Sequence, residues 1–134
     1  MKMEAIKKVY NFLEEAKTFF LATVEGDQPR VRPYGAFVMF EDKLYIMAFA
    51  RTNATLQVEQ NPKAEICAFK GKTLRIECRL VEDDRQEVKD AMLEKMPSLK
   101  AGLGEKGENA VMLRVTDATA TFYQIMEPIE TVTF

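Results

Sequence analysis

The segment 19–62 constrains the fold most strongly, because it combines two predicted β-hairpins with one short helix. Two turns, at residues 25–28 and 41–42, separate predicted strands over 18–24, 29–40 and 43–49. Thr52 or Asn53 caps a predicted helix that reaches Gln60, and Asn61-Pro62 stops it. Connections this short join neighbouring antiparallel strands, so a meander is expected.

The flanking segments extend this pattern. Helical spacing of Ile6, Val9, Leu13 and Ala16 predicts a first helix over 3–16. Alternating apolar residues predict further strands over 63–70, 73–81, 111–115 and 119–125. Asp84 and Glu87 form a predicted capping box for a helix that Pro97 ends. A flexible connection is expected over 102–109, and a short tail follows the last strand.

Together these elements predict a mainly β (α+β) fold in one domain, residues 1–134. Six or seven antiparallel strands remove their edges most simply by closing into a small barrel plugged by three short helices. An open α+β sandwich is the alternative. Eight methionines and nine phenylalanines supply the core filling. A filled barrel has no internal cavity, so a ligand is expected on the outer wall, in a groove that a second subunit completes.

Composition excludes several classes of function. A net charge of −2, with bases scattered among acids, argues against a nucleic-acid partner. The apolar runs 19–24 and 44–50 are too short to span a membrane, and the charged N-terminus does not resemble a signal, so a cytoplasmic location is expected.

Histidine is absent from the chain. Its absence removes Ser-His-Asp hydrolysis, Cys-His proteolysis, His-ligated haem and most zinc enzymes. Cys67 and Cys78 lack metal-ligand spacing and are interpreted as reduced core thiols. Redox chemistry would therefore require an organic cofactor.

Basic residues near the predicted short helix indicate a phosphate site. Arg30, Arg32 and Tyr34 share one face of their strand, which we expect to be the outer wall. Arginine matches phosphate geometry, and a helix start offers free N–H groups. Arg32 and the turn Arg51-Thr52-Asn53 are therefore predicted to hold one phosphate, against the alternative of solvated surface charges.

The order of FLATVEGDQPRVRP, KLYIMA, QNPKAEICAF and GKTLRIECRLVED resembles the pyridoxamine 5'-phosphate oxidase-like, FMN-binding split-barrel family. The resemblance covers residues 19 to about 123. It implies a split antiparallel barrel that forms a homodimer with FMN between its subunits. By the same resemblance, the cofactor-binding residues are Arg30, Val31, Arg32, Pro33, Met47, Ala48, Arg51, Thr52, Asn53, Gln57, Lys72 and Arg75.

Some features of the family are missing here. Many members hold the phosphate with a lysine before the short helix, where this chain has Thr52 or Asn53, which leaves Arg51 as the substitute. Authentic oxidases carry a C-terminal tryptophan that this chain lacks, so vitamin B6 oxidation is not expected. Haem-degrading and nitroimidazole-reducing members typically use histidine, whose absence argues against both activities.

The sequence thus predicts an FMN-dependent oxidoreductase acting on an unidentified small molecule. Two alternatives stay open: a flavin-carrying electron-transfer or sensing module, and a dimeric scaffold without a ligand.

Overall fold

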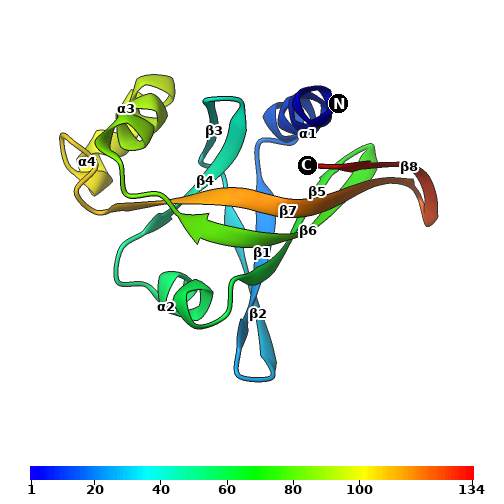
Figure 1. The fold of residues 1–134 in the computed structure, drawn as a ribbon, viewed down its shortest axis with the longest axis horizontal. Helices are drawn as coiled ribbons and strands as arrows, with labels where there is room; N and C mark the ends of the chain where they lie inside the picture. The colour runs from blue at the N-terminus through cyan, green and yellow to red at the C-terminus, as the bar shows by residue number, and fades with distance from the viewer.

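The computed structural model describes residues 1–134 and consists of one antiparallel sheet of eight strands with helices packed around it (Figure 1). The strands are β1 (Phe19–Glu25), β2 (Gln28–Tyr34), β3 (Phe37–Phe40), β4 (Lys43–Phe49), β5 (Lys63–Lys70), β6 (Lys72–Glu82), β7 (Ala110–Gln124) and β8 (Glu127–Thr133). The helices are α1 (Lys2–Ala16), α2 (Asn53–Gln60), α3 (Gln86–Lys95), α4 (Lys100–Leu103) and a 3-10 turn, η1 (Pro97–Leu99).

The mainly β, α+β class is confirmed, whereas the predicted counts of six or seven strands and three helices are wrong. The sheet follows the order β2-β1-β5-β6-β7-β4-β3, and β8 pairs with the second half of β7. No ladder joins its end strands β2 and β3, so the sheet stays open there. Phe19 bridges the opening through edge contacts with Tyr34 and Phe37, each at 6.1 Å between ring centroids.

The predicted strand 29–40 is in fact two strands at opposite ends of the sheet path. The chain leaves β2 at Gly35, where a side chain would begin 3.4 Å from the Lys17 carbonyl oxygen. A Cβ at this position would therefore be in van der Waals contact with the backbone at the end of α1. The corner between β2 and β3 therefore falls where local alternation gives no sign of a break.

The two predicted strands 111–115 and 119–125 form one strand, β7. Its register against β6 shifts between Glu77 and Arg79, opposite Asp117, which has a positive φ of 49°. This bulge reverses the alternation of buried side chains without ending the ladder. The predicted C-terminal tail forms β8, whose mostly exposed residues gave no alternating signal.

Two other local predictions are corrected. No side chain caps α3, which begins at Gln86, and Asp83 rather than Asp84 accepts the Arg85 backbone N–H, at 3.2 Å. The segment 102–109, expected to be flexible, includes the end of α4 and turns tied by backbone hydrogen bonds. Leu103 in this segment is fully buried.

The core has two parts on opposite faces of the sheet. The larger cluster fills the inner face and includes Leu44, Ile46 and Ala48 of β4, with α1 packed against it. The smaller cluster includes Tyr45 and Met47 on the other face of β4, beneath α3. Helices therefore cover the outer face of β3 and β4, while much of the outer face of β1, β2, β5 and β6 stays uncovered.

Candidate functional site

The junction between β4 and α2 is an exposed turn followed by an open helix start. Arg51 is exposed and has a left-handed φ of 60°. Thr52 occupies the N-cap position, but its hydroxyl donates to the Phe49 carbonyl oxygen at 2.9 Å and caps no helical N–H. The first backbone N–H groups of α2 have no side-chain acceptor, and the exposed Asn53 lies beside them. Such a helix start favours an anion.

Arg32 does not lie on the outer wall, contrary to the prediction. It pairs with Leu21 in the β1–β2 ladder, and directly paired residues project to the same side of a sheet. Leu21 is fully buried, so Arg32 faces inward, as do Arg30 and Tyr34, whose partners Thr23 and Phe19 are buried. The two arginines therefore lie on the inner side of the hairpin.

A hydrogen-bonded cluster ties Arg32 to α2. Its guanidinium donates to Gln57 Oε1 at 2.9 Å, Thr23 Oγ1 at 2.8 Å and the Leu21 carbonyl oxygen at 3.1 Å. The Thr23 hydroxyl also donates to Gln57 Oε1, at 2.6 Å. The structure thus brings together Arg32 and Gln57, both predicted site residues, through contacts within the chain.

Thr23 was missed by sequence reasoning. It is only 1% exposed and stands at an apolar position of β1, between the buried Leu21 and the hairpin end. A threonine in an otherwise apolar alternating series was the only available signal. Arg30, two residues before Arg32, is instead exposed and paired with Glu25 at 2.8 Å.

An apolar cavity of about 330 Å³ lies where β2 gives way to β3. It is lined by Pro33, Tyr34, Gly35, Ala36, Met47, Phe49, Met96 and Leu99. Burial raises the pKa of the Tyr34 phenol, and the Arg32 charge partly offsets this effect. The cavity therefore presents apolar walls and the hydroxyl of Tyr34. One of its wall residues, Phe49, precedes Arg51 by two residues in the chain.

The remaining predicted site residues do not line this cavity. Ala48 packs in the inner core, and Val31 projects to the outer face with 69% of its surface exposed. Lys72 is exposed at the start of β6. Arg75 forms an ion pair with Glu65 at 2.9 Å and lies over the Tyr123 ring at 5.8 Å.

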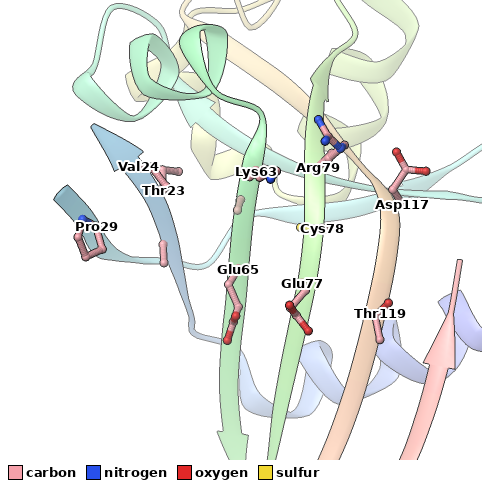
Figure 2. A pocket seen from close by; sticks show the side chains of 12 residues that line it. Thr23, Val24, Pro29, Lys63, Glu65, Glu77, Cys78, Arg79, Asp117 and Thr119 are labelled. Atoms are coloured by element: carbon pink, nitrogen blue, oxygen red, sulfur yellow. The ribbon is translucent and has the colours of Figure 1, made fainter. Parts of the chain in front are cut away.

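A second, polar hollow of about 470 Å³ lies on the uncovered outer face of β1, β5, β6 and β7 (Figure 2). Its charged residues are Lys63, Glu65, Glu77, Arg79 and Asp117. None of these five residues was predicted from the sequence as a site residue. No group of three or more potential metal ligands occurs in the structure, and no helix is long and apolar enough to cross a membrane.

Known proteins resemble this chain over nearly its whole length. The family model described as pyridoxamine 5'-phosphate oxidase matches residues 5–121. A NimC/NimA family protein from Clostridium acetobutylicum is 39% identical, with a TM-score of 0.89, covering 97% of this chain and 94% of its own. No curated protein matches the sequence.

More distant structures share the fold. General stress protein 26 from Bacillus anthracis is 19% identical, with a TM-score of 0.74 and coverage of 98% of this chain and 99% of its own. A protein from Mesorhizobium loti described as FAD-binding is 16% identical, with a TM-score of 0.65 and coverage of 85% and 91%. The length of the family match and the 39% identity together establish that this chain belongs to the pyridoxamine 5'-phosphate oxidase family.

Proposed function

We propose that the protein binds FMN as a homodimer and catalyses a flavin-dependent oxidation or reduction of a small molecule. The observation that carries this proposal is an apolar cavity lined in part by Phe49, which lies within four residues of the uncapped start of α2 along the chain. A flavin needs an apolar site for its fused ring and a cationic or N–H-rich site for its phosphate. The family membership and the FAD-binding neighbour agree with a flavin, and FMN is the form with a single phosphate.

The residues present fit this cofactor in two places. Pro33, Met47 and Phe49 provide apolar walls for the ring. Arg51 and the first N–H groups of α2 provide positive charge for the phosphate. We expect the other predicted ligands, Arg30 and Arg32, to act from the inner side of the hairpin.

Bound flavin supplies electron or hydride transfer. The chain's own residues bind it, hold it in place and shield it from water. Tyr34 carries its proton at neutral pH, as a phenol ordinarily does, and burial raises its pKa further, so its hydroxyl can donate a hydrogen bond into the cavity. Arg32, held by Gln57 and Thr23, places a positive charge near enough to Tyr34 to lower the pKa of its phenol against the effect of burial. Such a charge favours an anionic reduced ring.

The absorption spectrum of the purified protein tests the cofactor directly. Mass spectrometry of the ligand that heating releases from the protein then distinguishes FMN, FAD and a deazaflavin. Turnover of NADH or NADPH with an acceptor supports the oxidoreductase. Bound flavin without turnover indicates a carrier or sensor, and a colourless protein that refuses all three flavins indicates a scaffold and overturns the proposal.

Arg51→Ala tests the phosphate site. We expect it to weaken FMN binding by about 1–3 kcal/mol, because one charge-assisted hydrogen bond to the phosphate is lost. Flavin fluorescence quenching measures this affinity. Arg114→Ala is the matched control, since Arg114 lies on β7 beside a different cavity, near Lys2 and Asp42. Equal affinities of the Arg51→Ala variant and the unmodified protein would contradict the assignment.

A further inference from the structure

One wall of the apolar cavity comes from the segment 96–102, which follows α3, and not from the sheet. Met96 and Leu99 of this segment line the cavity. Further along, a side chain at Gly102 would begin 3.6 Å from the ring of Phe49, another lining residue. We call residues 96–102 the helical wall, because they close the cavity on the side away from the strands.

Backbone hydrogen bonds do not tie the helical wall to the sheet. Met96, Leu99 and Gly104 donate their N–H groups to carbonyl oxygens three or four residues earlier, at 2.9, 3.1 and 2.9 Å. No backbone hydrogen bond of residues 96–102 reaches a strand. Buried Leu103 holds the C-terminal end of the wall. The position of its N-terminal end therefore depends on side-chain contacts.

Lys95, the last residue of α3, makes those contacts. Its ammonium group donates to the Phe37 carbonyl oxygen of β3 at 2.6 Å and forms an ion pair with Glu14 of α1 at 3.1 Å. The same group lies 3.7 Å from the centroid of the Phe37 ring and 4.7 Å from that of the Tyr10 ring. One side chain thus joins α3 to β3 and to α1, which lie on either side of β3 (Figure 1).

The surroundings of Lys95 make this contact stronger than a surface ion pair. Its side chain is only 23% exposed, and burial lowers its pKa while the Glu14 charge partly offsets that effect. Cation–ring and charged hydrogen-bond contacts strengthen when water is excluded. Phe37 directly follows Ala36, and Lys95 directly precedes Met96, and both Ala36 and Met96 line the cavity. The contact therefore links two walls of the cavity, one residue away from each.

We propose that Lys95 is a positioning residue that fixes the helical wall against β3 and so sets the width of the cavity. This step rests on the proposed function, in which the cavity receives the flavin ring. With Lys95 in place, Met96 and Leu99 close the cavity on a flat ring. Without it, the wall moves away from the sheet more often, and the ring escapes faster.

Hydrogen exchange of the flavin-free protein, followed by mass spectrometry, tests the wall itself. Lys95→Met keeps a side chain of similar size but removes the charge. We expect its amides over 96–102 to exchange roughly tenfold faster or more, with those of β6 and β7 unchanged. Lys100→Met is the matched control, because Lys100 is an exposed lysine of the same wall whose side chain forms no ion pair or hydrogen bond. Lys95→Arg retains the charge and the donor and should keep the slow exchange.

Three outcomes of the exchange experiment would overturn the proposal. They are unchanged exchange over 96–102 in Lys95→Met, a uniform acceleration that includes β6 and β7, and a Lys95→Arg variant that exchanges as fast as Lys95→Met. The second outcome would mean that Lys95 contributes to overall stability and does not position the wall.

Stopped-flow fluorescence of FMN release tests the consequence for the cavity. We expect Lys95→Met to release FMN roughly tenfold faster than the unmodified protein and Lys100→Met to release it at the unmodified rate. Faster local exchange with an unchanged release rate would overturn the role in cavity width. If the unmodified protein binds no FMN, the proposed function fails, whereas the exchange data still decide whether Lys95 holds the wall.

Discussion

Arg32 links its own hairpin, β1–β2, to the helix α2. Its guanidinium joins β2 to β1 and, through Gln57, to α2. Gln57 is only 5% exposed, so its side-chain oxygen depends on partners inside the chain. A cation that completes a nearly buried polar cluster stabilises the fold whether or not it also contacts a cofactor.

We expect Arg32→Ala to lower the free energy of unfolding by about 1–3 kcal/mol, because it removes donors from Thr23 and Gln57 in a shielded site. Arg30→Ala is the matched control, two residues earlier on the same face of β2. Its exposed pair with Glu25 contributes only about 0.2–1 kcal/mol. Urea unfolding without flavin measures both variants, and equal losses would contradict the structural role of Arg32.

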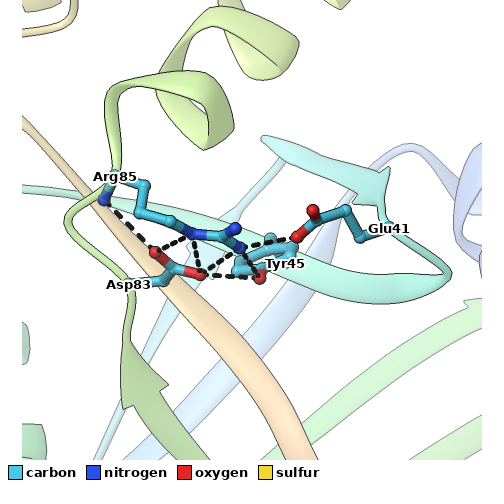
Figure 3. Close-up of polar contacts among 4 residues, drawn as sticks. All are labelled: Glu41, Tyr45, Asp83 and Arg85. Carbon is cyan, nitrogen blue, oxygen red and sulfur yellow. Dashed lines mark hydrogen bonds and ion pairs between the residues drawn. The ribbon is translucent and has the colours of Figure 1, made fainter.

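A polar cluster lies at the joint between β6 and α3, beside the apolar contacts of α3 (Figure 3). The buried Tyr45 of β4 donates its hydroxyl proton to Asp83 Oδ2 at 2.8 Å. Arg85 donates to both Asp83 oxygens and to Glu41 Oε1 of the β3–β4 turn at 2.8 Å. Its guanidinium also lies over the Phe40 ring at 5.6 Å. Two segments that are distant in sequence, 40–45 and 83–85, thus meet around the Asp83 carboxylate and the Arg85 guanidinium.

The Asp83 carboxylate gives this joint a pH dependence. Hydrogen bonds from Arg85 and Tyr45 hold the pKa of Asp83 well below its usual value in the folded state. A lowered folded-state pKa contributes stability above the unfolded-state pKa of roughly 4, and this stability is lost as the pH falls toward the folded-state pKa. Acid should therefore loosen the attachment of α3.

We expect Asp83→Asn to lower the free energy of unfolding at neutral pH and to narrow its difference from the unmodified protein between about pH 5 and pH 2. Chemical unfolding at a series of pH values measures this. The control is Asp84→Asn, because Asp84 is exposed and makes no side-chain hydrogen bond. A difference for Asp83→Asn that stays constant over this pH range would contradict the linkage.

On the scale of the whole molecule, helices cover one half of the outer face of the sheet and leave the other half uncovered. The helices α3, η1 and α4 lie over β3 and β4, whereas β1, β5 and β6 present charged and apolar side chains to the outside (Figures 1 and 2). The proposed function includes a homodimer. Its stability then depends on protein concentration, because two chains unfold as one unit.

We expect a tenfold increase in protein concentration to raise the melting temperature by roughly 2–3 °C for a dimer of this size. Differential scanning calorimetry measures this effect. If the melting temperature of the unmodified protein does not change with protein concentration, the dimer prediction is contradicted.

Local sequence determined most of the strands and the family. Strict alternation defines the hairpin of β5 and β6, and Pro62 fixes the end of α2, because both signals depend only on neighbouring residues. The order of the hairpin motifs along the chain sufficed to predict the family, which the matched residues 5–121 confirm.

Only the tertiary structure decided which face each site residue occupies. Alternation groups Arg30 with Arg32 and Val31 with Pro33, but neither set is apolar enough to mark the inner side, and pairing with β1 turns the arginines inward. Period-two alternation shows which side chains share a face of a strand. Pairing with other strands determines whether that face is directed toward the core or toward the outside.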